Sequence, residues 1–503
     1  MKKIHFKHSF LALSVAMFMA SCSDEFIEVQ PTGTYLEENF YQNETQAYQG
    51  LVATYDIMRK QVGGFENMVA MFNAGSDDFY AGGGSSTDGA GIQGFSNYTI
   101  NPTSMPGSFW SDYYQGIFRA NTLLVKLPDV PMDDTTRARF TAETKALRAY
   151  YYFQLVTIFG EIPFYTTNLT QDQFYEIEKS APAVVYAQIE QDLLEAIPSL
   201  PNTVDLTTEA GRFTKGSAQA VLGKVYLFQG KNAEAAAQFA EVNGTPGQTS
   251  QYGYKLLANY ADLWVIDNKF NSESILEASH TSKSDVIWDN WGNGVDEGNA
   301  VNIMVGPRGY SAIAPTAPKY QTGWAFNPVT TDLANFMAGD PRFASTIEDL
   351  GALKAAGAIN YTPAYMDTGY FLKKFLPLEV DKTTGGGNWE LNYRQNGYVI
   401  RLADTYLMEA EALGGTGARA QALLDAVRAR VGLASVPVSL QAIWDERRLE
   451  LAGEGHRWND LVRTGRAATV LASRGFTAGK HEHLPVPIKE TENTKVKQNP
   501  AYN

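Results

Sequence analysis

Hydrophobic residues recur with a helical period in three separated stretches of the chain. The clearest is residues 216–242, where Leu222 and Tyr226 lie four residues apart. Ala235 and Phe239 repeat that spacing after a Gly-Lys-Asn turn. Apolar residues one turn apart share a face of a helix, and a glycine turn between two such runs lets the chain reverse. The stretch therefore predicts two antiparallel helices.

A second copy of this pattern lies at residues 398–433, and a third lies at 142–160. In the second copy Leu402 and Tyr406 have the same spacing, and Gly414 begins the break between the two helices. Helix pairs of this kind, with small residues that let the backbones approach, are typical of tetratricopeptide repeats. The alternative is a set of generic amphipathic helices. Because the copies are scattered rather than consecutive, we expect a helical-repeat scaffold and not a simple solenoid.

Two long irregular regions separate these helices. Residues 73–112 are rich in Gly, Ser and Asn, and residues 279–330 contain several Trp and Tyr. Loops this long in a compact protein are functional or disordered, and the aromatic content argues against disorder. We therefore expect a mainly α-helical protein with a tetratricopeptide-like scaffold and a loop-rich lobe that carries the ligand surface. The expected scaffold is 35–72, 110–260 and 395–470, and the expected lobe is 73–109 and 265–394.

The N-terminus has the order of a secretory signal. Three lysines precede an apolar run of 11 residues from Ser9 to Met19, and the small residues Ala20 and Ser21 follow. That run is too short to cross a bilayer, which takes about 20 residues. Cys22, the only cysteine, stands where a lipobox has the residue that becomes acylated; the alternative is an ordinary cleavage site beside a chance cysteine. We expect a signal peptide at 1–21, a mature chain of 22–503 and a lipid anchor on Cys22.

Composition narrows the classes of ligand. Without residues 1–21, 38 basic residues face 55 acidic ones, a net charge of −17. Such a surface repels phosphate backbones, so nucleic acid is not an expected partner. Aromatic residues make up 12% of the chain, with 27 Tyr and 8 Trp. That share exceeds what a core needs and suits a surface that binds amphipathic ligands.

Motifs that carry chemistry are almost absent. Gly89-Ala90-Gly91-Ile92-Gln93-Gly94 matches G-x-G-x-x-G, but it follows a polar stretch and not a strand, so we expect no cofactor there. Neither G-x-S-x-G nor H-E-x-x-H occurs. His481-Glu482-His483 is interpreted as a solvated turn and not a metal site. No catalytic residue, cofactor or metal is expected, although a glycosidase carboxylate pair that meets only in the fold stays open.

The segment "WDERRLELAGEGHRWNDLVRTGRA", residues 444–467, is rich in charge for a helix that also carries apolar residues. Its glutamates and arginines predict a half-buried helix pair held by ion pairs, with a structural and not a catalytic role. The string resembles the C-terminal signature of the SusD/RagB family, E-R-R-x-E followed by E-x-x-R-W-x-D-L-x-R. The matching residues are Glu446, Arg447, Arg448, Glu450, Glu454, Arg457, Trp458, Asp460, Leu461 and Arg463. The closing "QNPAY" is also similar to that family's usual end.

The resemblance implies a surface lipoprotein of glycan-utilising Bacteroidetes that is not an enzyme. It also implies a variable lobe and a role as a lid on a SusC-like TonB-dependent outer-membrane transporter, to which the protein delivers oligosaccharide or polysaccharide. Ser23-Asp24-Glu25 resembles the export signal that sends such lipoproteins to the cell surface. The alternatives are a RagB-like peptide binder, an extracytoplasmic glycoside hydrolase and a tetratricopeptide lipoprotein that only scaffolds an assembly.

The ligand surface is expected in the lobe, around "SDVIWDNWGNG". Sugars present flat C–H faces between rings of hydroxyls, so a glycan site needs exposed aromatic planes with polar groups around them. The alternative for the two tryptophans is a buried helix face. The family resemblance adds the loop after the first helices. The "GPRGY" segment is expected to complete the site, and the alternative for Arg308 is that it only braces the loop. The predicted glycan-binding residues are Trp288, Trp291, Asp289, Asn290, Asp77, Asp78, Tyr80, Arg308 and Tyr310.

Overall fold

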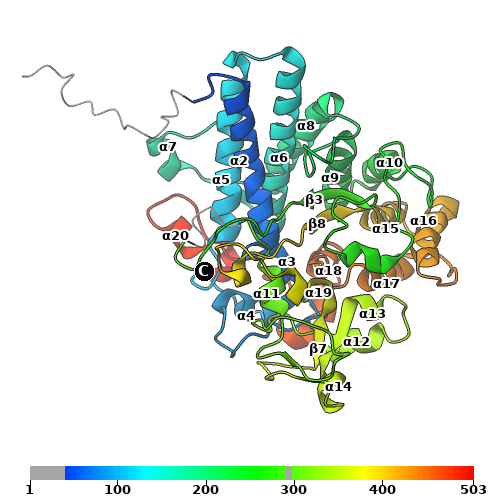
Figure 1. The fold of residues 1–503 in the computed structure, drawn as a ribbon. Helices are drawn as coiled ribbons and strands as arrows, with labels where there is room; N and C mark the ends of the chain where they lie inside the picture. The colour runs from blue at the N-terminus through cyan, green and yellow to red at the C-terminus, as the bar shows by residue number, and fades with distance from the viewer. Residues whose placement is uncertain (1–39, 291–296) are drawn as a thin grey trace, which may run out of the picture.

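Long helices form one side of the molecule and short helices, strands and loops form the other (Figure 1). The computed structural model describes residues 40–290 and 297–503, so Cys22 and Trp291 lie outside the described residues. α2 (Glu44–Gly63), α5 (Ser108–Lys126) and α6 (Asp134–Phe159) stand side by side, and α8 (Pro182–Ala196) packs against α6. The mainly α-helical prediction is confirmed.

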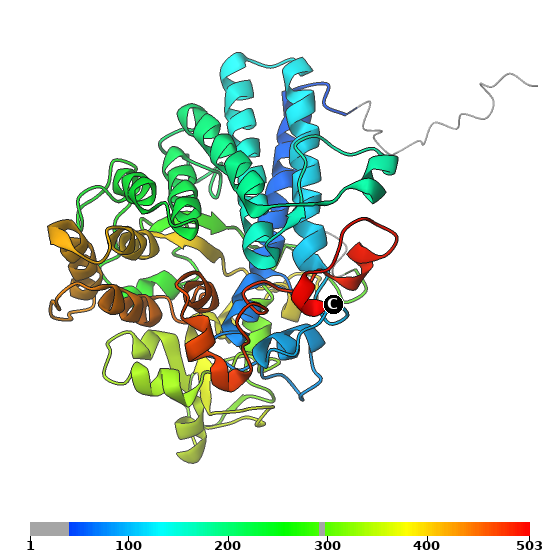
Figure 2. The ribbon, with the colours of Figure 1, turned by 180° about the vertical axis from the view of Figure 1, so that it is seen from behind.

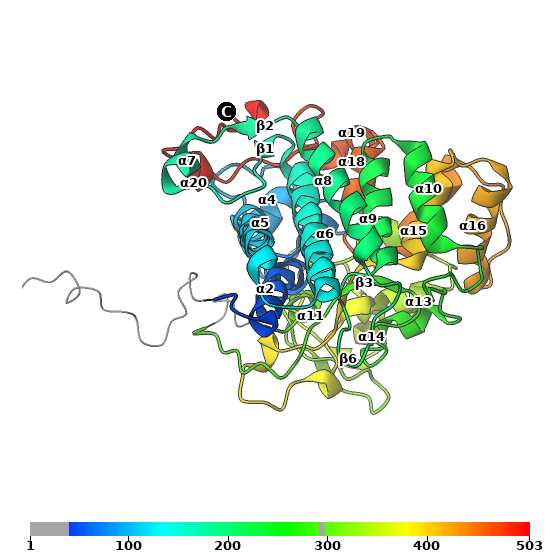
Figure 3. The same ribbon diagram turned by 90° about the horizontal axis from the view of Figure 1, so that it is seen from above.

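The two clearest predicted helix pairs are present. The first is α9 (Lys215–Phe228) with α10 (Asn232–Asn243), and the second is α15 (Leu402–Ala412) with α16 (Gly417–Arg430). A Cβ on Gly223 would lie 2.7 Å from the ring of Phe239, so the missing side chain lets α10 pack closely on α9. Seen from above, α6, α9, α15 and α16 follow one another across the molecule (Figure 3).

One boundary of the second copy was wrong. Residues Gly397–Arg401 form strand β8, not helix, and pair antiparallel with β3 (Ser274–Ala278). The partner strand is more than a hundred residues away in sequence, so the local period could not reveal it. A tertiary pairing has overridden the helical pattern.

Glycines of the G-x-G-x-x-G string serve packing. Gly89 precedes α4 (Ala90–Ser96) with a φ of 68°, a left-handed conformation that glycine adopts at little cost. A Cβ on Gly91 would lie 2.5 Å from Pro106, and one on Gly94 would lie 3.2 Å from the backbone of Ile100. The glycines of this string therefore let α4 pack closely against its neighbours.

A smaller hydrophobic core lies below the helical array and is built mainly from residues 301–376. Its elements are short, and the strands occur as two-stranded pairs. They are α11 (Val301–Val305), β4 (Ser311–Ala312), α12 (Thr331–Phe336), α13 (Phe343–Thr346), β5 (Ile347–Asp349), α14 (Leu350–Ala355), β6 (Ile359–Asn360) and β7 (Tyr370–Leu372). We call this part the lobe and the helical array the scaffold.

The remaining elements connect the two parts or close the chain. They are α3 (Met68–Ala74), β1 (Ile162–Pro163), α7 (Gln171–Glu176), β2 (Lys179–Ser180), α17 (Leu440–Glu450), α18 (Arg457–Arg463), α19 (Ala467–Val470) and α20 (Ile488–Thr491). The C-terminal segment, red in Figure 2, returns to the end of α6, where the Asn499 amide donates to the Phe159 carbonyl at 3.1 Å. His481, predicted to lie in a solvated turn, is 2% exposed and packs against Tyr98 and Phe476.

The charged signature helices enclose a buried ion network. All five N–H groups of Arg401, which is 1% exposed, donate to Glu273, Glu450 and Glu454 at 2.6–2.9 Å. From the lobe, Arg342 Nη1 donates to Glu450 at 2.9 Å, and Lys374 Nζ donates to Glu454 at 2.8 Å. The network therefore joins scaffold and lobe through two carboxylates.

Burial acts to raise the pKa of Glu450, but the guanidiniums of Arg430, Arg401 and Arg342 outweigh it, so the pKa lies well below the ordinary value. Glu450 is therefore a carboxylate at neutral pH, and the cations around it are what make its burial tolerable.

Every other charged residue of the signature is paired as well. Arg447 binds Asp404 and Asp460, Arg463 binds Glu411 and Asp460, and Glu446 binds Arg342 and Arg428. Trp458 is fully buried, with its ring stacked on Phe72 at 5.3 Å. The predicted ion-paired helix pair, α17 and α18, is confirmed, with Gly453 and Gly455 between them at φ 80°.

Removing Arg401 should take a cation away from three buried carboxylates. We expect Arg401→Met to lower the free energy of unfolding by about 3–5 kcal/mol, measured by urea denaturation. Lys495→Met is the control, because its pair with Glu176 lies at the surface, and it should leave the unfolding midpoint unchanged. Equal midpoints for the Arg401 variant and the wild type would show that the network does not hold the fold.

Candidate functional site

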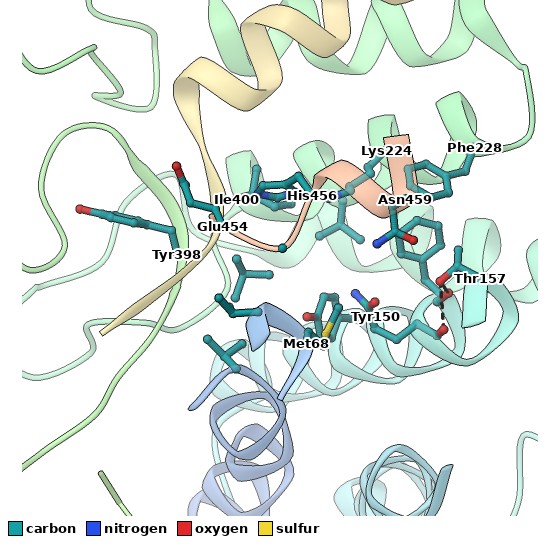
Figure 4. A pocket seen from close by; sticks show the side chains of 17 residues that line it. Met68, Tyr150, Thr157, Lys224, Phe228, Tyr398, Ile400, Glu454, His456 and Asn459 are labelled. Carbon is teal, nitrogen blue, oxygen red and sulfur yellow. Dashed lines mark hydrogen bonds between the residues drawn. The ribbon is translucent and has the colours of Figure 1, made fainter. Parts of the chain in front are cut away.

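The cavity drawn in Figure 4 lies inside the scaffold and is too small for a sugar ring. It is lined from α6, α9, β8 and α18 and has a volume of about 60 Å³. Ligand pockets are typically several hundred Å³. His456 and Lys224 line it, and burial lowers the pKa of His456 to about 4. The imidazole is therefore neutral at pH 7, and the cavity has room for about four waters.

Aromatic side chains gather instead where the lobe loops meet the end of α2. The rings of Trp288 and Trp324 lie 6.0 Å apart with 36° between their planes, and the ring of Phe65 meets Trp324 edge-on at 5.7 Å. Trp288 is 45% exposed, and Trp324 and Phe65 are half-buried. We call Phe65, Trp288 and Trp324 the aromatic platform.

Backbone hydrogen bonds hold Trp324 in place. The amides of residues 323–327 each donate to a carbonyl at 2.7–2.9 Å, and four of the five acceptors belong to α11 or the two residues that follow it. Trp324 itself donates to Ile303. Ala325 and Asn327 have φ of 58° and 51°, a strained conformation for residues other than glycine. Such strain persists only where the surroundings fix it, and is common at ligand sites.

Trp288 is held by a turn and by a second loop. The backbone N–H of Trp288 donates to Asn388 Oδ1 at 3.1 Å, and Ile287 N–H donates to Asn290 Oδ1 at 2.9 Å. Asn290 therefore shapes the turn, while the side chain of Asp289 is exposed beside the tryptophan. The structure places Trp288 in a loop rather than on a helix face, so the alternative of a buried helix face is wrong for this residue.

Arg308 borders the platform. Its Nε donates to the carbonyl oxygen of Trp324 at 3.0 Å, and its Nη2 binds Asp88 Oδ2 at 3.0 Å. Tyr310 faces another way, because its hydroxyl donates to the Pro318 carbonyl. Burial, with a contribution from the Glu348 carboxylate, raises the pKa of Tyr310 to about 12.

Asp77, Asp78 and Tyr80 are engaged in the packing of the signature helices. Asp77 forms a two-bond ion pair with Arg457 at 2.8 and 2.9 Å, and Asp78, 1% exposed, binds Arg448. The guanidinium of Arg474 lies 4.6 Å from the ring centre of Tyr80. The structure does not bring these three residues to the platform, and we leave them out of the candidate site.

Three site residues were not predicted. Phe65 and Asp88 carry no distinctive signal in the sequence. Trp324 stands in the aromatic segment "GWAFNP", and the left-handed conformations of Ala325 and Asn327 beside it are known only from the structure. Only the fold shows that this segment faces Trp288.

Neither a metal centre nor a membrane span emerges from the described residues. Within residues 40–290 and 297–503, no group of three or more His, Cys, Asp or Glu side chains is placed to hold a metal ion. No helix in that part of the chain has both the length and the apolar character to cross a membrane. The arrangement offers stacking surfaces with polar groups beside them, which is the chemistry of binding.

Comparisons with known proteins agree with a role in binding. Residues 272–502 match the model of the SusD family, and residues 29–227 match a model described as "Starch-binding associating with outer membrane". SusD-like protein P25 of Formosa agariphila is 26% identical over 526 residues, which span 95% of each chain. The starch-binding protein SusD of Bacteroides thetaiotaomicron is 25% identical over 419 residues, 74% of each chain.

Solved structures give a nearer match. A laminarin-binding SusD-like protein is 65% identical with a TM-score of 0.91, and the match covers 92% of this chain and all of the other. Surface glycan-binding protein A from Bacteroides thetaiotaomicron, in complex with laminarihexaose, is 26% identical with a TM-score of 0.81 and covers 91% of this chain and 99% of the other. These two relatives are named for binding and not for catalysis, and this chain groups with them and not with enzymes. The chain is a member of the SusD family.

Proposed function

We propose that this protein is a cell-surface glycan-binding lipoprotein that captures β-1,3-glucan, as oligosaccharide or polysaccharide. The observation that carries the proposal is the aromatic platform, held by backbone hydrogen bonds at the edge of the lobe. The 65% identical laminarin-binding structure supports the choice of glycan. The relative that was solved with laminarihexaose supports it independently.

The platform suits this ligand physically. Aromatic planes bind the C–H faces of sugar rings, and the exposed edge of Trp288 leaves room for a chain that extends past it. The 36° between the two indole planes fits a chain that curves, as β-1,3-linked glucans do. Because an open surface encloses little of its ligand, we expect affinities in the micromolar to millimolar range.

We further propose that the protein passes its glycan to a SusC-like TonB-dependent transporter in the outer membrane. The N-terminal pattern around Cys22 supports a lipid anchor that would keep the protein beside such a transporter. Trp291, Asp289 and Asn290 stay proposed contributors to glycan binding through their position next to Trp288. A RagB-like peptide binder is the alternative, and a peptide panel beside the glycan panel separates the two.

Truncating either platform tryptophan should weaken glycan binding. We expect Trp324→Ala and Trp288→Ala each to cost about 1–3 kcal/mol of binding free energy, because each removes a stacking surface. Calorimetry with laminarihexaose measures this. Trp444→Ala is the matched control: it removes an indole of α17 that packs against Arg466, and this variant should bind like the wild type. If both platform variants also bind like the wild type, the glycan binds elsewhere.

The anchor can be tested in cells. If Cys22 is acylated, Cys22→Ala should release a folded protein from the outer-membrane fraction, while the wild type should be retained and should co-purify with a β-barrel transporter from solubilised membranes. A Cys22→Ala protein that stays in the outer membrane would contradict the anchor, and wild-type protein recovered without a barrel would contradict the partnership.

A further inference from the structure

Asp88 and Arg308 form a salt bridge beside the aromatic platform. Hydrogen bonds to the backbone fix this pair on one side, and its other side is exposed to solvent. Asp88 Oδ2 accepts from the Gly84 amide at 2.6 Å and from Arg308 Nη2 at 3.0 Å. Arg308 Nε donates to the Trp324 carbonyl at 3.0 Å. Both side chains are 36% exposed. The pair is thus fixed to the backbone that positions the platform.

We call Arg308 Nε, Arg308 Nη2 and Asp88 Oδ2, which form hydrogen bonds, the inner atoms of the pair. The outer atoms are Arg308 Nη1 and Asp88 Oδ1. Within the described part of the chain, no hydrogen bond engages Arg308 Nη1 or Asp88 Oδ1. Nη1 carries two donors, and Oδ1 is an acceptor. A charged donor and a charged acceptor therefore lie next to each other at the surface, in an orientation set by the inner bonds.

The loop around the pair keeps it accessible. A Cβ on Gly84 would lie 2.9 Å from Arg308 Nη2, so the loop passes close to the guanidinium. Tyr365 donates its backbone N–H to the Gly83 carbonyl at 3.0 Å and is 37% exposed, and Met366 follows with a φ of 54°. The loop that carries Tyr365 is therefore joined through its backbone to the loop that carries Asp88.

Such a pair fits two hydroxyls on adjacent carbons, because one can donate to the carboxylate while the other accepts from the guanidinium. An internal residue of a β-1,3-glucan has no such diol. Its O1 and O3 are in linkages, and O2, O4 and O6 are not on neighbouring carbons. A glucosyl residue at the non-reducing end, or one attached as a β-1,6 branch, keeps O2, O3 and O4 free. The polar pair therefore distinguishes chain ends and branches from chain interiors.

We propose that Asp88 and Arg308 determine specificity by binding the vicinal diol of a terminal or branching glucosyl residue, while the platform binds the main chain. This inference rests on the proposed β-1,3-glucan function and adds to it a preference within that class. An interior residue would leave the charged pair without partners, and that loss is the source of the discrimination.

The experiment uses three methyl β-glycosides, so that O1 is blocked throughout. They are a linear β-1,3-glucan hexaose, the same hexaose with O3 and O4 of its non-reducing end methylated, and the methylated hexaose with one β-1,6-glucosyl branch. Calorimetry gives the Kd of each for the wild type, Asp88→Asn, Arg308→Lys and the control Glu176→Gln. Both site substitutions keep side-chain size while removing charge or the planar fork.

For the wild type and the control, we expect methylation to raise Kd about tenfold if the chain end supplies the diol. If the branch supplies it, we expect the branched probe to bind about tenfold more tightly than the methylated linear one. Asp88→Asn and Arg308→Lys should bring the three Kd values to within about twofold of one another. Wild-type protein that binds all three probes equally, or variants that keep the wild-type ratios, would overturn the inference and leave the platform intact. A wild type that binds none of them would overturn the proposed function as well.

Discussion

Glu450 and Glu454 are buried carboxylates whose charge is balanced by cations from opposite parts of the molecule. Arg401 and Arg430 come from the scaffold, while Arg342 and Lys374 come from the lobe. An unpaired charge in this position would cost several kcal/mol, so neither part can move away without stranding charges in the other. The network is therefore a constraint on how lobe and scaffold lie together. It explains why the signature helices are so rich in charge although they take no part in chemistry.

The candidate site depends on that constraint. Its aromatic platform combines Phe65, next to the end of a scaffold helix, with Trp324 from the lobe and Trp288 from the loop after β3, so the ring positions require scaffold and lobe to keep their relation. Backbone amides then fix Trp324 onto α11. A preorganised surface loses little entropy when a ligand binds, which matters where contacts are few and shallow. The fold thus supplies rigidity, and the loops supply the chemistry.

The sequence predicted the parts of the fold that follow from local patterns. The pairs α9–α10 and α15–α16 were readable because their apolar spacing and turns are local, and the charged helices α17 and α18 because opposite charges recur at helical spacing. Strand β8 could not be predicted from the sequence, since its partner β3 is distant along the chain. Trp288 and Arg308 were predicted from residue type and context, and the structure places them at the candidate site, where their role in binding stays a prediction. Trp324 was missed because only tertiary structure brings it to Trp288, and Asp77 and Asp78 were assigned to the ligand although they pair with distant arginines.

The central claim is that the glycan lies on the aromatic platform of a rigid molecule. Hydrogen exchange with and without saturating laminarihexaose tests it most directly, since it reports every amide at once. The account predicts slower exchange in the segments around the platform, residues 83–92, 284–290 and 303–326, with α9, α10 and the signature helices unchanged. Protection on another face, such as the groove lined by residues 202–212 and 252–277, with none at the platform, would contradict it.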